Sequence, residues 1–336
     1  MVFRQPSVQY QLKCPVMLRL RRFTKHANLN PILWEATRNW TSIKKFIEIQ
    51  IPVPWGHIAG KWWGNPDSKP LLGLHGWQDN AGTFDGIAPI LPNHISLLAL
   101  DLPGHGLSSW YPSSTSYNSS QGLLVLRHVV KYFKWNKIYL LGHSMGSAYG
   151  YLYAAVFPDE VEKYIGLDLA RPMAIDPYAL VLEAQNIIDR CLNNDHLSMG
   201  SGPKFSYDEL MSRLFTGYQG SLSEESCKVL LKRGAVKFCD GKYCYSRDPR
   251  LSRSTNDLSA FPISHINRMA VNIKCEVLNI RGKSGASFIP LDQYYNALEL
   301  MKISAKRFEF YEVEGSHHFH LNEPSETAAL ISQFLD

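Results

Sequence analysis

The stretch of residues 140–147, Leu-Leu-Gly-His-Ser-Met-Gly-Ser, constrains the fold of this chain more than any other. An apolar run over 137–141 precedes it and a helix-compatible run over 148–157 follows it. This arrangement predicts a strand, a sharp turn and a helix, with Ser144 at the turn of a G-x-S-x-G nucleophile elbow. Gly142 and Gly146 leave room for the strained serine backbone. The alternative is an ordinary Gly/Ser turn between two elements.

Strand and helix patterns alternate on both sides of this turn, which predicts a mostly parallel sheet with helices on both faces. Residues 46–63 carry Pro52 and Pro54 and suit an antiparallel hairpin at a sheet edge. Buried strands are expected at 70–74, 95–100, 137–141, 161–168, 275–281 and 306–313. Helices are expected at 84–91, 121–133, 148–157, 291–301 and 323–334. Ligands then belong at the carboxyl ends of the parallel strands.

The alternation stops between residues 170 and 272, which predicts a helical cap inserted into the α/β core. The core would comprise 44–169 and 273–336, and helices are expected in the cap at 177–192, 207–215 and 223–236. Four apolar side chains near the start of the cap are expected to shape a substrate pocket, namely Met173, Tyr178, Leu182 and Ile187.

Residues 1–43 form a basic extension, with six basic residues and no acidic one before Glu35. It has the composition of a mitochondrial presequence, and a variable arm without a targeting role fits equally well. Because the net charge of +5 is confined to this arm, a nucleic-acid partner is not expected. No apolar run is long enough to span a bilayer. Six scattered cysteines predict free thiols in an intracellular protein, cytoplasmic or mitochondrial, that is not secreted. The oligomeric state is left open.

Four short motifs occur in the order that the α/β-hydrolase superfamily shows. They are His75-Gly76-Trp77, Asp101 to Gly106, Gly142 to Gly146, and Gly315-Ser316-His317. Residues 46–336 therefore resemble this superfamily, and the resemblance implies an α/β-hydrolase fold. Two further stretches, Leu74 to Ala81 and Arg247 to Leu251, are similar to the kraken and serine hydrolase-like proteins.

A serine hydroxyl needs a base before it becomes a good nucleophile, and an imidazole is the usual one. In the proteins that the chain resembles, the catalytic histidine stands about seven residues before a helix-starting proline. Counting back from Pro324 gives His317. His318 is the alternative, since a shift of one residue would exchange the two.

The resemblance also implies an oxyanion hole made of two backbone N–H groups. One belongs to Met145, directly after the nucleophile, and the other to Trp77, in the loop after an earlier strand. Two converging donors stabilise negative charge that exists only in the transition state.

The carboxylate that should orient the histidine departs from the common pattern. After Arg281-Gly282, where the acid usually follows, the chain has no carboxylate before Asp292. The haloalkane dehalogenases show another arrangement, in which the acid precedes an arginine-proline pair, and Asp168 stands at that spacing here. An isolated aspartate in such an apolar strand would be costly without a partner. Asp168 is therefore the expected acid, with Asp292 as the alternative and capping or pairing with Arg171 as the non-catalytic interpretation.

These residues predict a serine hydrolase that cleaves a carboxylic ester or thioester with an apolar acyl part, using Ser144, His317 and Asp168. The expected partner is a small-molecule substrate, and neither a metal nor an organic cofactor is needed. Dehalogenation is disfavoured because Ser144, and not an aspartate, is at the elbow. Two alternatives stay open, since a fold does not fix a substrate. One is C–C bond or amide hydrolysis by the same triad, and the other is a low-turnover binding protein.

Overall fold

The computed structural model describes residues 45–336 except 195, 198–201, 254–260 and 286–287. The prediction of a targeting segment in the arm falls outside the described residues. Within the described part of the chain, no helix combines the length and apolarity that a bilayer span requires. Four of the five cysteines in that part, Cys227, Cys239, Cys244 and Cys275, form no disulfide bond with one another.

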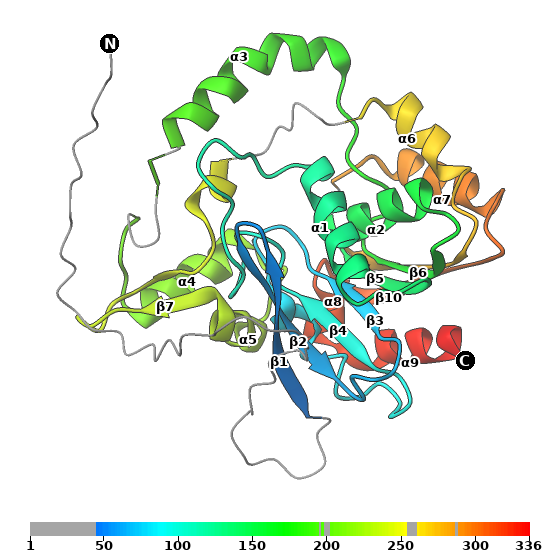
Figure 1. The fold of residues 1–336 in the computed structure, drawn as a ribbon, viewed down its shortest axis with the longest axis horizontal. Helices are drawn as coiled ribbons and strands as arrows, with labels where there is room; N and C mark the ends of the chain where they lie inside the picture. Colours follow the sequence, from blue (N-terminus) through cyan, green and yellow to red (C-terminus); the bar gives the residue numbers. More distant parts are fainter. Residues whose placement is uncertain (1–44, 195, 198–201, 254–260, 286–287) are drawn as a thin grey trace, which may run out of the picture. The chain divides into compact units, whose positions relative to one another are not determined.

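An eight-stranded sheet forms the centre of the fold (Figure 1). Its spatial order is β1-β2-β4-β3-β5-β6-β9-β10, and all neighbours from β4 to β10 are parallel. The strands are β1 (Phe46–Val53), β2 (Gly56–Trp63), β3 (Leu71–Leu74), β4 (Leu97–Leu100), β5 (Ile138–His143), β6 (Val161–Leu167), β9 (Glu276–Ser284) and β10 (Arg307–Ser316). The expected α/β-hydrolase fold, with a mostly parallel sheet, is confirmed.

The antiparallel hairpin is also confirmed, because β1 pairs with β2 from Phe46 opposite Trp63 to Val53 opposite Gly56. β1 is the edge strand, where a proline such as Pro52 removes no hydrogen bond from a central ladder. The helix expected at 84–91 is wrong. The chain instead forms a short 3-10 helix, η1 (Ala81–Phe84), followed by turns. Gly86 and Pro89 in this stretch are poor helix formers.

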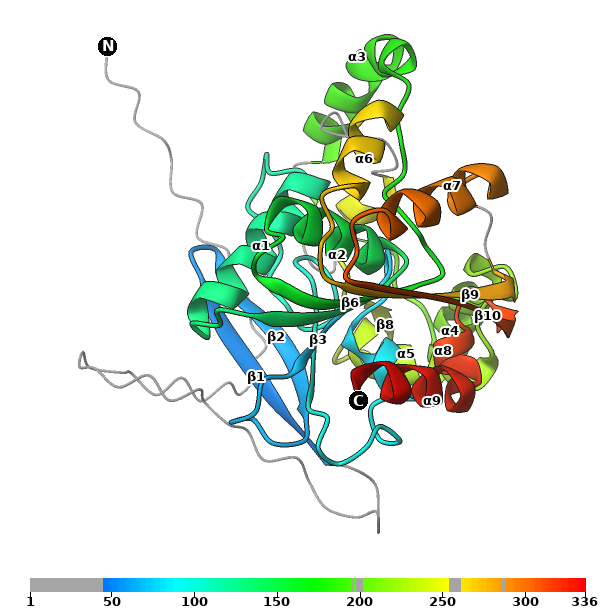
Figure 2. The same cartoon turned by 90° about the vertical axis from the view of Figure 1, so that its right-hand side faces the viewer.

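Helices cover both faces of the sheet (Figure 2). One face packs against α1, α2, α6 and α7, through residues such as Val125, Leu152, Ile266 and Leu298. The other packs against η1, α8 and α9, through residues such as Phe84, Phe319 and Phe334. The bounds are α1 (Ser119–Tyr132), α2 (Met145–Val156), α6 (Ile263–Ala270), α7 (Leu291–Lys302), α8 (Phe319–Asn322) and α9 (Pro324–Leu335). With both faces buried, the central strands are apolar throughout, as in Leu71–Leu74.

The segment between β6 and β9 adds further helices and a two-stranded sheet. A separate apolar cluster holds α4 and α5 together and includes Leu210, Leu214, Leu230 and Leu321, the last of which belongs to α8. The elements before α6 are α3 (Pro177–Asn194), α4 (Tyr207–Gly217), α5 (Glu224–Gly234), β7 (Ala235–Lys237), β8 (Tyr243–Tyr245) and the 3-10 helix η2 (Pro249–Arg253). α4 and α5 are therefore packed next to the loop that follows β10.

A buried ion pair fixes α5 to the carboxyl end of β4. Arg233 of α5 donates from Nη2 to Asp101 Oδ2 at 2.6 Å and also pairs with Glu48. Asp101 in turn accepts backbone N–H bonds from Ala81 at 2.7 Å and Leu107 at 2.9 Å. Because removing one partner of such a buried pair leaves an uncompensated charge, this contact strongly constrains the position of α5.

Candidate active site

Ser144 lies in the turn between β5 and α2, as the elbow pattern predicts. Its backbone has φ 52° and ψ −116°, a conformation that is strained for a residue with a side chain. The turn is tight because glycines flank it at 142 and 146. A Cβ atom on Gly142 would come within 2.4 Å of the Gly146 backbone, and one on Gly146 within 2.0 Å of the Leu74 carbonyl oxygen. Ser144 itself is only 8 % exposed.

His317 and Asp168 meet although 149 positions separate them along the chain. The Nδ1 atom of His317 lies 2.6 Å from Oδ2 of Asp168, and both side chains are buried. Asp168 directly follows β6 and has φ 53°. The other carboxylate oxygen, Oδ1, accepts the backbone N–H of Gly282 at 2.8 Å.

The Asp168 carboxylate reaches the chain segment where the acid is usually found. A Cβ atom on Gly285 would lie 2.4 Å from the carboxylate oxygens of Asp168, so only glycine leaves room for them. Asp292, the alternative acid, is exposed in the first turn of α7. The structure thus brings Asp168, and not Asp292, to His317.

His318 has different partners from its neighbour. Its Nδ1 atom lies 2.6 Å from the Ser221 hydroxyl, and its Nε2 atom lies 3.4 Å from Oδ2 of Asp79. The structure therefore pairs His317 with Asp168 and directs His318 to Asp79.

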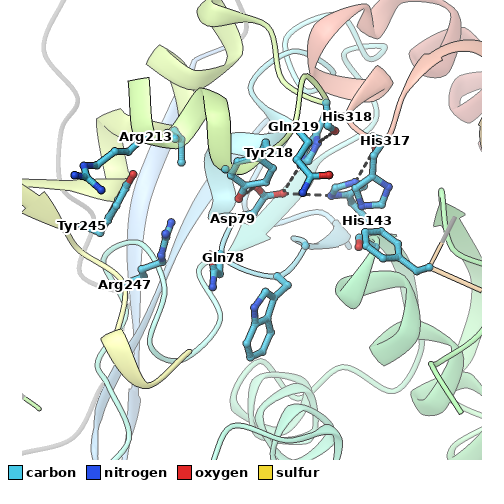
Figure 3. A pocket seen from close by; sticks show the side chains of 17 residues that line it. Gln78, Asp79, His143, Arg213, Tyr218, Gln219, Tyr245, Arg247, His317 and His318 are labelled. Atoms are coloured by element: carbon cyan, nitrogen blue, oxygen red, sulfur yellow. Dashed lines mark hydrogen bonds and ion pairs between the residues drawn. The ribbon is translucent and has the colours of Figure 1, made fainter. Parts of the chain in front are cut away.

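Ser144, His317 and His318 all line one cavity of about 360 Å³ (Figure 3). Apolar surface comes from Trp77, Leu214 and Phe288, and the ring of Phe288 packs edge-on against His317. The remaining lining residues are Gly76, Gln78, Asp79, His143, Arg213, Gly217, Tyr218, Gln219, Ser221, Tyr245 and Arg247.

The apolar residues expected to shape this pocket do not line it. Met173, Tyr178 and Leu182 are 59–73 % exposed, on α3 or just before it, while Ile187 is buried. The expectation was wrong because helical periodicity shows that α3 is amphipathic, yet it does not show which neighbour its apolar face contacts. The wall of the cavity opposite the sheet comes instead from α4, the loop after it, and the end of β8.

Trp77, expected to donate to the oxyanion, belongs to a loop that two neutral histidines hold. His75 donates from Nδ1 to the Gly76 carbonyl and accepts the Leu102 N–H at Nε2. His105 donates from Nδ1 to the Pro103 carbonyl and accepts the Gln78 N–H at Nε2, 3.2 Å away. Met145 is the first residue of α2, so its N–H has no acceptor within the helix.

A second buried network lies behind His317 and was not predicted. His143 donates from Nε2 to the carbonyl oxygen of His317, 3.0 Å away, and its Nδ1 lies 3.3 Å from Asp79 Oδ2. Tyr218 donates its hydroxyl to Asp79 Oδ1 at 3.1 Å. The network therefore fixes the backbone of His317 from behind. Both Asp79 and His143 stand inside the motifs quoted above, and that position is the signal that could have identified them.

Within the described residues, one group of side chains has ligand atoms near enough to hold a metal ion. It consists of Asp79, His143 and His318, whose ligand atoms lie within 4.8 Å of one another. The same side chains already contact Tyr218, Ser221 and the His317 backbone. Proton transfer from a serine to an imidazole needs no metal.

Four buried histidines make the stability of the fold acid-sensitive. Burial lowers the pKa of His143 to about 3 and holds the pKa values of His75, His105 and His320 below the ordinary value of about 6.5. Below pH 6.5 the unfolded chain binds protons that the folded chain does not. As the pH decreases below 6.5, the free energy of unfolding should therefore fall by up to about 1.4 kcal/mol per pH unit for each such histidine.

Urea denaturation at intervals between pH 7.5 and 5 measures this slope. Carboxylates titrate mainly below this window, so they contribute little to it. A free energy of unfolding that stays constant from pH 7.5 to 5 would contradict the expectation.

The order and direction of the strands, with a serine at the tight turn after β5, define an α/β hydrolase. Residues 69–189 match the family model described as the alpha/beta hydrolase fold. The chain is 39 % identical to a probable serine hydrolase of Drosophila melanogaster over 291 residues, covering 86 % of this chain and 87 % of that protein. It is 34 % identical to serine hydrolase-like protein 2 of Homo sapiens over 300 residues, covering 86 % and 93 %. The chain therefore belongs to the serine hydrolase-like proteins of the α/β-hydrolase superfamily.

Solved structures share the fold. A hypothetical protein of Pseudomonas aeruginosa PAO1 superposes with a TM-score of 0.75 and 26 % identity, covering 86 % of this chain and 97 % of that one. The thioesterase domain from the curacin biosynthetic pathway gives a TM-score of 0.72 at 24 % identity, covering 85 % and 99 %.

Proposed function

We propose that this protein hydrolyses a carboxylic ester or thioester through a covalent acyl-enzyme. In this proposal Ser144 is the nucleophile, His317 the general base and acid, and Asp168 the carboxylate that orients the imidazole. The backbone N–H groups of Met145 and Trp77 bind the oxyanion. The observation that carries the proposal is the 2.6 Å contact between His317 Nδ1 and Asp168 Oδ2, beside the cavity that Ser144 also lines.

The chemistry follows from the tautomer that this contact imposes. With its proton on Nδ1 and directed at Asp168, the His317 ring keeps a lone pair at Nε2. Nε2 can then take the proton of the Ser144 hydroxyl as its oxygen attacks the substrate carbonyl carbon. The same proton passes to the leaving oxygen or sulfur when the carbonyl re-forms, which leaves the acyl group on Ser144.

Water completes the cycle by the same route. His317 removes a proton from water, the resulting hydroxide adds to the acyl carbonyl, and the proton returns to the Ser144 oxygen as the acid departs. In both halves negative charge develops on the carbonyl oxygen. Two N–H donors favour this state over the ground state, and losing one typically costs about 3 kcal/mol.

An acyl group with an apolar part suits the lining of the cavity. Trp77, Leu214 and Phe288 contribute apolar surface to the cavity that Ser144 and His317 line, and the ring of Phe288 packs against His317. Burial of methylene groups against such surface contributes roughly 0.8 kcal/mol each.

A fluorophosphonate probe tests the proposed nucleophile directly, because it reacts with an activated serine without requiring the right acyl group. We expect labelling of the wild-type protein and no labelling of the Ser144→Ala variant. A panel of esters, thioesters and amides then separates the proposed chemistry from amide cleavage by the same residues. Folded wild-type protein that takes up no label would favour the low-turnover binding alternative.

A further inference from the structure

Two arginines line the end of the cavity away from His317. Arg213 belongs to α4 and Arg247 follows β8, and Figure 3 shows both on the same side of the cavity as Tyr245. His143 and His317 lie on the opposite side of Asp79 in this view. The mechanism proposed above uses neither arginine.

The backbone on both sides of Arg247 is fixed to the core. Asp248 donates its N–H to the Gly104 carbonyl at 2.8 Å and accepts the Tyr117 hydroxyl at 2.7 Å. Ser246 donates its hydroxyl to the Arg233 carbonyl at 2.8 Å. Both neighbours are buried, so the position of Arg247 beside the cavity is set by the fold.

The charged residues of the segment Arg247 to Leu251 have two different roles. Arg250 pairs with Asp248 at 2.6 Å and also donates to the carbonyl oxygens of Tyr111 and Pro112. These two charged residues anchor the segment to the core. The remaining charged residue, Arg247, is the one that lines the cavity.

Aromatic rings support both guanidinium groups. The Arg247 Cζ atom lies 4.0 Å from the centre of the Tyr245 ring, and the Arg213 Cζ atom lies 4.3 Å from that of Phe205. A stacked guanidinium loses less freedom when it binds an anion, and its planar set of donors matches the oxygens of a carboxylate or phosphate.

Neither the half-buried Arg247 nor the exposed Arg213 has the acidic partner that several other arginines of this chain possess. In the part of the chain that the structure describes, neither Arg213 nor Arg247 has a carboxylate oxygen within 4.0 Å. By contrast, Arg127, Arg233, Arg250, Arg281 and Arg307 each pair with an aspartate or glutamate. Asp79, which also lines the cavity, accepts the Tyr218 hydroxyl at 3.1 Å and lies 3.4 Å from Nε2 of His318.

Two like charges that line one cavity, each stacked on an aromatic ring and with no carboxylate of the described residues within 4.0 Å, fit an anionic ligand. We propose that Arg213 and Arg247 bind a carboxylate or phosphate group of the substrate, remote from the bond that is cleaved. This inference rests on the proposed hydrolase function and narrows its substrate to anionic esters or thioesters. The apolar part of the acyl group would then span the distance between the arginines and Ser144.

Matched esters that differ only in charge test the inference. The probes are 4-nitrophenyl monoesters of adipic, suberic and sebacic acid, each compared with the same compound methylated at the free carboxyl group. For one chain length we expect kcat/KM to be at least about tenfold higher for the anion, as for a charge-assisted hydrogen bond. A corresponding series that ends in phosphate shows which oxyanion is preferred.

Substitution by methionine keeps much of the arginine stem and removes the charge. In Arg247→Met, and separately in Arg213→Met, the ratio of kcat/KM for the anionic and neutral esters should fall toward one. Arg268→Met, at an exposed position of α6 that does not line the cavity, is the matched control and should keep the ratio. Arg213 is exposed, so its replacement should not impair folding even if that of Arg247 does.

Fluorophosphonate labelling distinguishes a failure of the arginine site from a failure of the proposed hydrolase function. Labelled wild-type protein that cleaves anionic and neutral esters equally would overturn the arginine site while leaving the hydrolase function standing. The site would also be overturned if both methionine variants kept the full preference for the anion. A folded protein that neither takes up label nor cleaves any ester would overturn the hydrolase function itself.

Discussion

Replacing His317 by glutamine is expected to lower kcat about 10⁶-fold, the loss typical of removing the base from a serine triad. Glutamine is polar and of similar length, but it has no group that can accept the Ser144 proton near neutral pH. Asp168 would then have no imidazole ring to orient. Steady-state hydrolysis of an ester found in the substrate panel gives the rate, and circular dichroism checks the fold.

The neighbouring position supplies the matched control. His318→Gln removes an equally buried imidazole one residue away, and a glutamine amide can still contact Ser221 or Asp79. We expect a loss of less than about 100-fold, since His318 lines the cavity but contacts Ser221 and Asp79 and not Asp168. If His318→Gln were the inactive variant and His317→Gln retained activity, the assignment of the base would be exchanged.

The sequence predicts those parts of the site that depend on local geometry. Gly142 and Gly146 flank Ser144 because any Cβ atom there would collide with backbone, so the turn can be recognised from five residues. The alternation of strand and helix patterns predicted the parallel sheet for a similar reason, since a parallel strand that is buried on both faces is apolar throughout. The same local rules overestimated the helix at 84–91, where glycine and proline interrupt an otherwise apolar pattern.

The contents of the cavity depend on packing between distant segments, which no local pattern reports. Arg213 and Arg247 are 34 positions apart, and a motif can show that Arg247 is special without showing where its side chain lies. Asp79 and His143 stand in recognisable motifs, yet their contact with the backbone of His317 requires a third segment of the chain. The expectation that the apolar face of α3 lines the pocket was wrong for the same reason. Amphipathicity identifies which face of a helix is apolar, but not which segment that face contacts.

Asp168, the proposed orienting carboxylate, could be assigned from the sequence only by resemblance. Its replacement is expected to give the second large loss of activity. Asp168→Asn should lower kcat about 10⁴-fold with the fold intact. The reason is the second hydrogen bond of this carboxylate. Oδ1 accepts the Gly282 N–H at 2.8 Å, so the asparagine must keep its carbonyl oxygen there and turn its NH₂ group toward His317.

An NH₂ group facing Nδ1 forces the imidazole proton onto Nε2, which then has no lone pair for the Ser144 proton. The loss should thus appear in kcat more than in KM, because the cavity that binds substrate is unchanged. Asp292→Asn, at the exposed alternative position, is the matched control and should retain the wild-type rate. A full rate in Asp168→Asn together with a large loss in Asp292→Asn would show that the orienting carboxylate comes from α7, after the inserted segment and not before it.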